Sequence, residues 1–178
     1  LIEKYFKKLT YNNPSALNLN DDVFFDKKNN VVVSSDTYVE GVHFLNFRNP
    51  DLVIKKILRS SISDLYCKGV KPKFIFVGAS GNKKSFSSKN LNLIFKSLKE
   101  EQNKYGIKLS GGDTTKSKKL TFSITTLGYS KRIIKRNKSK NGDDIYVTGN
   151  IGDSYLGLQI LKKRVFLNLK TNKYFVKK

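Results

Sequence analysis

The pattern of hydrophobic and polar positions predicts two amphipathic helices in the middle of the chain. In the first, apolar residues recur at helical spacing after Asn49 and Pro50, which suit the N-cap and the first position of a helix, and Gly69 suits its end. The second runs over about 89–105, and Gly106 closes it. The apolar positions are Ile54, Ile57, Leu58, Ile62, Leu65 and Tyr66 in the first helix and Leu91, Ile94, Phe95 and Leu98 in the second.

Short runs of β-branched and aromatic residues predict strands around the two helices. The run 120–129 begins with the alternation of apolar and polar residues that is typical of a half-buried strand. Because strands come before, between and after the helices, we expect an α+β fold with both helices on one sheet. The expected strands are 23–25, 31–36, 74–77, 120–129 and 145–147.

The two ends of the chain add further expected helices and a domain boundary. Residues 2–9 place apolar side chains on one helical face, and 151–165 also has the character of a helix. The glycine-rich entry 148–154 marks the expected crossing into a second domain. We therefore expect an N-terminal domain at 1–148 and the beginning of a C-terminal domain at 149–178.

Size and composition indicate one core and a reducing compartment. The 178 residues are enough for one good core. The chain contains no Met, begins at Leu1 and trails through 168–178 without a stop signal, so we expect a fragment of a longer protein. The single cysteine, Cys67, excludes an internal disulfide, and no apolar run reaches membrane-spanning length. We expect a cytoplasmic protein that has no membrane partner.

The strong positive charge invites a nucleic-acid function, but its distribution argues against one. The formal net charge is +21, and nearly all of it comes from lysines spread over every segment. No arginine-rich run occurs, and most aromatic residues lie inside apolar runs, as core residues do. We therefore expect no specific nucleic-acid partner, although a basic field would still attract anionic substrates such as phosphates.

The hexapeptide Ser110-Gly-Gly-Asp-Thr-Thr115 is the first candidate for chemistry. Its two glycines allow the backbone to approach an anion closely, and Asp113 is a hard oxygen ligand suited to Mg²⁺. The alternative is a tight turn between two strands, in which Asp113 is only a turn residue.

Four aspartates lie where strands end, where turns begin or beside an apolar helix face: Asp22, Asp36, Asp64 and Asp113. Each alone suits a cap, a turn or a solvated carboxylate, but together they suggest one acidic cluster. Such a cluster needs compensation because carboxylates repel one another, and oxygen ligands favour Mg²⁺. The single His and single Cys argue against zinc.

Carboxylates, Mg²⁺ and a glycine pair are what phosphoryl transfer needs. The chain contains neither a Walker A sequence nor the glycine loop of protein kinases. A nucleotide would therefore be held through metals, backbone amides and a few basic residues. Arg136 is the favoured phosphate contact, and its alternative is an exposed arginine in a basic loop.

In this order the motifs resemble those of the thiamine-monophosphate kinases, a family within the aminoimidazole-ribonucleotide-synthetase-like superfamily. The resemblance covers about residues 1–165, and its most specific segment, 34–44, separates these kinases from their superfamily relatives. The other matching motifs are Asp21-Asp22, Ser63-Asp-Leu65 with Gly69 and Pro72, Gly111-Gly-Asp-Thr-Thr115, the stretch 135–149 and Gly152-Asp-Ser154.

The resemblance implies a mixed, mainly antiparallel sheet with helices on one face, and an enzyme that transfers the ATP γ-phosphoryl group to thiamine phosphate. It also implies a homodimer formed through the N-terminal domain. The implied Mg²⁺ ligands are Asp22, Asp36, Asp64 and Asp113, assisted by Ser34 and Ser35. The implied ATP contacts are Gly112, Asp113 and Arg136, and His43 would contact the thiamine phosphate without acting as a general base.

Three departures from the family pattern bear on these expectations. Asn20 stands where the family has glycine, and Tyr66-Cys67-Lys68 replaces a small apolar segment. Nearly all of the family's second domain, with a further Asp-rich metal loop, is missing, so the chain alone could be inactive. Two alternatives stay open: another ATP-using enzyme of the superfamily, or a basic nucleic-acid-binding module whose aspartates are only caps.

Overall fold

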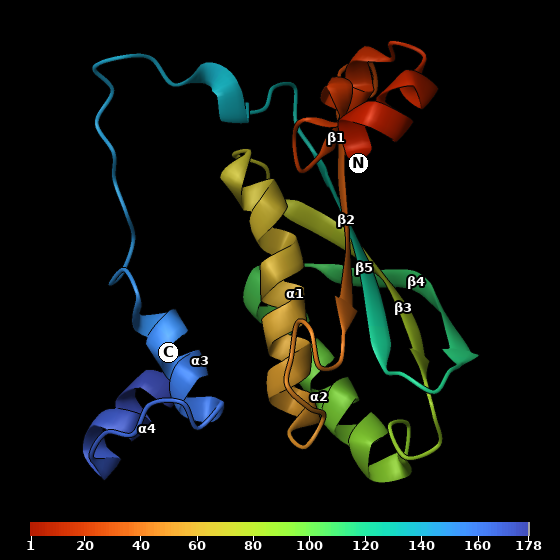
Figure 1. The fold of residues 1–178 in the computed structure, drawn as a ribbon. Helices are drawn as coiled ribbons and strands as arrows, with labels where there is room; N and C mark the ends of the chain where they lie inside the picture. Colours follow the sequence, from red (N-terminus) through yellow and green to blue (C-terminus); the bar gives the residue numbers. More distant parts are fainter. Residues whose placement is uncertain (178) are drawn as a thin grey trace. The chain divides into compact units, whose positions relative to one another are not determined.

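The computed structural model describes residues 1–177, which form two compact units (Figure 1). The first unit comprises Leu1–Lys138, and the second begins at Ser139. This boundary lies earlier in the chain than the expected one at 148/149.

A five-stranded sheet is the centre of the first unit (Figure 1). Its strands are β1 (Phe24–Asp26), β2 (Val31–Val39), β3 (Pro72–Gly81), β4 (Lys108–Lys116) and β5 (Thr121–Tyr129), in the order β1-β2-β5-β3-β4. All neighbouring pairs are antiparallel except β3 and β4, which are parallel. The predicted mixed, mainly antiparallel sheet is therefore confirmed.

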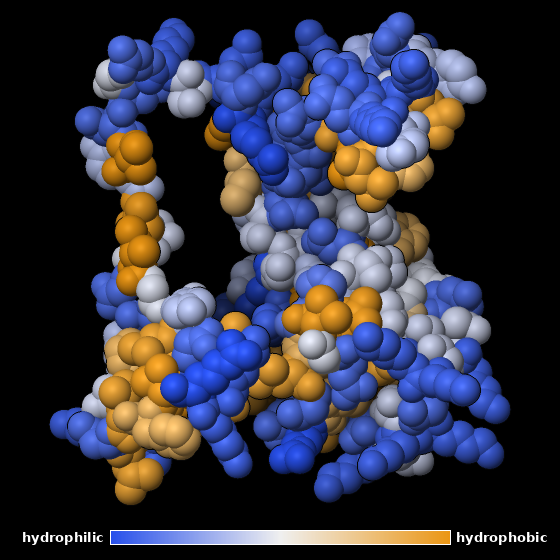
Figure 2. Space-filling view, in the orientation of Figure 1, coloured by the Kyte–Doolittle hydropathy of each residue, from blue (hydrophilic) through white to orange (hydrophobic). Residues whose placement is uncertain are grey.

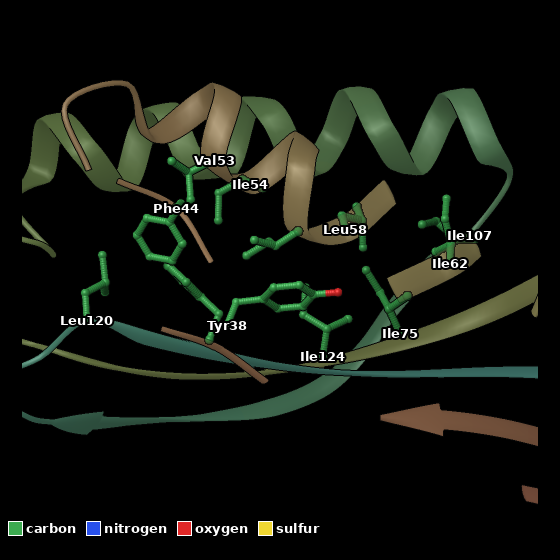
Figure 3. Packing of buried hydrophobic residues seen from close by; sticks show 12 residues of the cluster. Tyr38, Phe44, Val53, Ile54, Leu58, Ile62, Ile75, Ile107, Leu120 and Ile124 are labelled. Carbon is green, nitrogen blue, oxygen red and sulfur yellow. The ribbon is translucent and has the colours of Figure 1, made fainter. Parts of the chain in front are cut away.

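Two long helices, α1 (Pro50–Cys67) and α2 (Ser88–Tyr105), lie on one face of this sheet (Figures 1 and 3). Both were predicted within a residue or two. Gly106 takes the left-handed conformation at φ 64° and caps α2 through its N–H bond to the Gln102 carbonyl. Asn49 is the N-cap residue of α1, but its side chain makes no capping hydrogen bond.

The main core lies between the helices and the sheet (Figure 3). Ile57 and Leu58 of α1 are fully buried against Ile75, Phe122 and Ile124 of the strands. Each fully buried side chain of this size contributes about 1.5–3 kcal/mol relative to exposure. A smaller apolar cluster of Val23, Phe25, Val32, Leu65 and Val70, with Leu17 and Ile133 packed against it, joins the start of the sheet to the end of α1.

One predicted element is wrong, and another is confirmed only in part. The helix expected at 2–9 is present as two short helical segments, the π-helix η1 (Ile2–Phe6) and the 3₁₀-helix η2 (Lys7–Thr10), and a further 3₁₀ segment, η3 (Pro14–Leu19), follows. The apolar side chains of η1 and η2 stay exposed, whereas Leu17 of η3 packs against the smaller apolar cluster; helices this short are marginal without an apolar partner. Residues 145–147 form no strand in the described chain; Ile145 is 92% exposed, and no strand pairs with it there.

The second unit contains α3 (Asp153–Leu161) and α4 (Leu169–Lys177). The helix expected at 151–165 is thus shorter, and α4 was not predicted. Gly157 allows close packing, since a Cβ there would lie 2.4 Å from the Phe175 carbonyl oxygen. Within residues 1–177, no helix has the length and apolar character needed to cross a membrane.

Hydrophilic residues are spread over the face drawn in Figure 2 and do not gather into one stripe. This spread is what the even distribution of lysines along the sequence predicts.

Candidate active site

Three segments of the first unit meet at the buried carboxylate of Asp21. Its Oδ1 lies 2.5 Å from the Lys68 ammonium at the end of α1, and the Asp22 backbone N–H donates to the same oxygen. The backbone N–H of Arg136 donates to Oδ2 over a longer distance, 3.4 Å. The Lys68 and Asp21 side chains are only 5% and 6% exposed. The loop before β1, the end of α1 and the segment after β5 are therefore joined by one buried ion pair.

The pKa of Asp21 reflects these partners. Burial alone would raise it, but the Lys68 hydrogen bond and those from the Asp22 and Arg136 backbones together hold the pKa below its ordinary value. Asp21 is therefore ionised at neutral pH and accepts hydrogen bonds from all three segments.

Asp22 and Arg136 form a second, more exposed pair beside the first. One guanidinium nitrogen of Arg136 lies 2.6 Å from each Asp22 carboxylate oxygen, and the Arg136 and Asp22 side chains are 58% and 46% exposed. Chiefly through this hydrogen bond, Asp22 raises the pKa of Arg136. Arg136, the predicted phosphate contact, thus binds Asp22, a predicted metal ligand, in this structure.

Asp64 extends from α1 toward β2, where the Ser34 hydroxyl donates a 2.6 Å hydrogen bond to it. Burial raises the pKa of Asp64, and the negative charges of Asp36 and Asp22 raise it further against the opposing effect of Ser34. This mutual repulsion is the electrostatic signature of carboxylates that a cation would stabilise.

Asp36 is held by the buried Tyr38. The Tyr38 hydroxyl donates to Asp36 over 3.0 Å and lies 2.8 Å from the Ser61 hydroxyl on α1. The negative charges of Asp36 and Asp22 both act on Asp64, and the expectation that the three aspartates form one metal cluster stays a prediction.

Asp113 is not part of this group within the chain. The register links Asp36 of β2 to Gly112 of β4 across two intervening strands, so three strand spacings separate them. Because successive side chains alternate faces, Asp113 lies on the face opposite the helices. Ser35 shares that face and contacts the Thr125 hydroxyl at 3.0 Å, while Ser34 faces the helices.

The hexapeptide 110–115 lies inside strand β4 and is neither a loop nor a turn. Gly112 is required there for a reason that its sequence did not reveal: a Cβ would lie 2.0 Å from the carbonyl oxygen of Val77. The glycine permits the parallel pairing of β4 with β3 at the exposed edge of the sheet.

An apolar cavity of about 580 Å³ lies beside this edge. Ile94 and Leu98 of α2 line it together with Val77, and Gly112 and Asp113 lie at its margin. Its size and apolar lining suit a flat heterocycle next to polar backbone groups.

His43 lies in the loop after β2. Its Nδ1 accepts the Val39 backbone N–H at 3.0 Å, which leaves the Nε2 proton of the neutral ring free to donate. The imidazole meets the Tyr38 ring edge-on at 5.8 Å between centroids, and Tyr38 in turn holds Asp36. His43 is thereby connected to the carboxylate group through one side chain.

The donors at this site suit a hard cation in their chemistry, since all are carboxylates or hydroxyls. The Thr126 hydroxyl, opposite Ser34 in the sheet, is fully buried and has no hydrogen-bond partner in the described chain. However, no three His, Cys, Asp or Glu side chains within residues 1–177 converge closely enough to hold one ion. The oxygens of Asp22, Asp36 and Asp64 instead accept hydrogen bonds from Arg136, Tyr38 and Ser34.

Several residues of this site had no predicted role, namely Asp21, Tyr38, Ser61, Lys68 and Thr126. One signal could have identified the buried pair. Lys68 continues the buried stripe of α1 three residues after Leu65, and a lysine in that position needs a buried acidic partner. The other three depend on pairing between distant segments, which periodicity does not report.

The fold and this grouped site define a family. The family model described as AIR synthase related protein, N-terminal domain, matches residues 19–130, which include the whole sheet, α1, α2 and the three coupled carboxylates. The chain belongs to this AIR synthase related family.

Within that family, its similar relatives are thiamine-monophosphate kinases. The one from Buchnera aphidicola subsp. Schizaphis graminum is 36% identical over 184 residues, which cover 100% of this chain and 56% of the relative. The one from Buchnera aphidicola subsp. Acyrthosiphon pisum is 37% identical over 191 residues, with the same two coverages. The structure of AaThiL complexed with AMPPCP and TMP superposes with a TM-score of 0.84 at 23% identity, over 98% of this chain and 55% of that one. The chain spans about half the length of the curated relatives it matches.

Proposed function

We propose that the protein is an ATP-dependent kinase that converts thiamine phosphate to thiamine diphosphate and ADP. The observation that carries the proposal is the set of three carboxylates held by hydrogen bonds: Arg136 binds Asp22, Tyr38 binds Asp36 and Ser34 binds Asp64. Relatives named thiamine-monophosphate kinase align over the whole chain, and AaThiL is complexed with AMPPCP and TMP.

Asp22, Asp36, Asp64 and Ser34 would hold magnesium. Ser35 and Asp113, on the opposite face of the sheet, would supply oxygen ligands there, where a second copy would complete their site. Magnesium, when bound, supplies charge compensation for the phosphate oxygens. Arg136 would contact the ATP phosphates, and Gly112 with Asp113 would lie along the nucleotide. The apolar cavity between α2 and the sheet edge would take the adenine ring.

His43 would bind the phosphate of the second substrate through its Nε2 proton. A strong general base is unnecessary because the acceptor oxygen belongs to a phosphate that is already ionised. Alignment of the two phosphates can therefore carry most of the catalysis.

Two copies would pair through the helix-free face of the sheet. Both helices of the first unit lie on the opposite face, and the free face has half-buried apolar residues such as Val33 and Leu127 between its hydroxyl-bearing positions. A dimer would cover this face, which also carries Ser35 and Asp113.

Equilibrium binding of Mg²⁺·ATP to the intact protein tests the proposal. Asp36→Asn and Asp113→Asn are expected to weaken binding by at least about tenfold, because each removes a charged ligand. Asp144→Asn, at an exposed aspartate of the second unit, is the matched control and should bind as the wild type does. Unchanged affinity in both site variants would contradict the proposal.

A further inference from the structure

Lys68 occupies a position where a charged residue is costly. Its ammonium is buried at the end of α1, where the apolar residues Val23, Leu65 and Val70 cluster. Burial of two charges often costs as much desolvation energy as their attraction returns, so an apolar residue would serve packing as well. The Lys68–Asp21 pair therefore has its use in orientation and not in net stability.

The pair orients two segments at once. Through its side chain Lys68 holds Asp21, whose carboxylate also accepts the Asp22 and Arg136 backbone N–H groups. Through its backbone carbonyl Lys68 accepts the Ile134 N–H at 3.1 Å. One residue thus fixes the backbone on both sides of the site.

The residues that these contacts fix are the ones that carry the proposed chemistry. Asp22 follows Asp21 directly, and Arg136 lies two residues after Ile134. One guanidinium nitrogen of Arg136 lies 2.6 Å from each carboxylate oxygen of Asp22. A shift of either backbone segment would separate them.

We propose that Lys68 is a positioning residue for nucleotide and metal binding: buried against Asp21, it sets the placement of Asp22 and Arg136. This inference deepens the proposed function and rests on it. Lys68 itself touches no substrate; it acts through Asp21.

The first test reads the placement directly, without any ligand. Amide hydrogen exchange is measured at Asp22 and Arg136 in the intact wild type, in Lys68→Met and in the neutral pair Asp21→Asn/Lys68→Met. Lys68→Met alone leaves the buried charge of Asp21 unpaired, so this variant can fail to fold. The double variant has no unpaired buried charge and keeps the test valid in that case. We expect both amides to exchange at least about tenfold faster in the double variant, since the Lys68 ammonium no longer holds the accepting side chain at position 21 in place and one of its two oxygens is replaced by a donor.

The matched control is Arg59→Met, which breaks the other ion pair of α1 that has a buried carboxylate. Arg59 makes two hydrogen bonds of 2.7 and 2.6 Å to Glu101, which is 2% exposed. This variant should lose thermal stability without faster exchange at Asp22 or Arg136, because it touches neither segment.

The second test measures the dissociation constant of Mg²⁺·AMPPCP well below the unfolding temperature. The double variant is expected to recover most of the thermal stability that Lys68→Met loses, but to bind between about 10-fold and 100-fold more weakly than the wild type. Lys68→Arg, which keeps the charge, should restore part of the affinity.

If the double variant shows the same exchange rates and the same affinity as the wild type, the inference is overturned. Lys68 would then have a role in the fold alone. If the wild type itself does not bind Mg²⁺·AMPPCP, the proposed function fails, and the exchange rates at Asp22 and Arg136 alone decide the placement role. Faster exchange then supports it, and unchanged exchange overturns it.

Discussion

At the scale of single residues, Asp64 carries a stability cost that its proposed ligand would remove. Its pKa lies above the ordinary 3.8 because of burial and the charges of Asp36 and Asp22. The folded state therefore binds its proton more tightly than the unfolded state does. The resulting stability is present below pH 3.8 and is lost as pH rises through the raised folded pKa. At neutral pH Asp64 is ionised, so its full cost to the stability of the folded state is present.

Asp64→Asn is therefore expected to stabilise the metal-free protein at pH 7. The gain is up to about 1 kcal/mol after allowance for solvent screening, and it should vanish in acid, where Asp64 is protonated. Urea unfolding at several pH values measures it. An Asp64→Asn variant that is less stable than the wild type at pH 7 would contradict the electrostatic account.

Substitution of Asp21 should change the stability at pH 7 in the opposite direction in the same urea experiment. Its folded pKa is lowered, so its stabilisation is present above pH 3.8 and is lost as pH falls through the lowered value. Asp21→Asn should therefore lower stability at pH 7. The two substitutions separate a carboxylate whose charge lowers stability at neutral pH from one whose charge is compensated by Lys68 and backbone N–H groups.

At the scale of elements, the edge strand β4 depends on Gly112. A Cβ there would lie 2.0 Å from the Val77 carbonyl oxygen, so Gly112→Ala should cost about 3 kcal/mol by disrupting the β3–β4 pairing. Gly78→Ala is the control, since a Cβ at Gly78 meets the Ser123 Cβ at an ordinary 3.5 Å. Thermal unfolding compares them, and equal stability of the two variants would show that β4 is not paired in this way.

The contact between α1 and α2 depends on the Arg59–Glu101 pair. Arg59→Met leaves the buried Glu101 carboxylate without its partner and should cost about 2 kcal/mol, less than for a fully buried pair because Arg59 is 46% exposed. The neighbouring Lys55–Glu100 pair joins the same helices at the surface, so Lys55→Met should have little effect. Denaturant titration tests the contrast, which would fail if both substitutions cost the same.

The elements that the sequence predicted well are those whose local signals agree with their packing. Helix α1 has a proline start and an apolar stripe, and α2 has an apolar stripe and a glycine cap. The predictions departed from the structure where tertiary contacts decide the outcome. The helix expected at 2–9 breaks into two short helical segments whose apolar face has no buried partner, and 145–147 has no strand to pair with in the described chain. Strand β4 was missed because its glycines suggested a loop, although pairing with β3 requires them.

The site was predicted in part for the same reason. Spacing and chemistry selected Asp22, Asp36 and Asp64; the charges of Asp22 and Asp36 act on Asp64, but the role of the three as metal ligands stays a prediction. The separation of Asp113 follows from strand order and facing, which no local pattern contains. Apart from Lys68, the buried partners of the site were not predictable, because contacts such as that between Tyr38 and Ser61 join distant segments of the chain.

At the scale of the whole molecule, the net charge of +21 and the proposed anionic substrates are complementary. The lysines are spread along the whole sequence, so the charge would favour the approach of phosphates in general. In the proposed function, selection among them would fall to the carboxylates Asp22, Asp36 and Asp64, to Arg136 and His43, and to the apolar cavity.

Product analysis of the intact protein, supplied with ATP, Mg²⁺ and thiamine phosphate, tests the central claim most directly. The account predicts equal amounts of thiamine diphosphate and ADP, and at least a hundredfold lower rate for Asp36→Asn, since loss of a charged group at a phosphoryl-transfer site costs about 3 kcal/mol or more. ATP consumption without thiamine diphosphate, or an Asp36→Asn variant as active as the wild type, would contradict it.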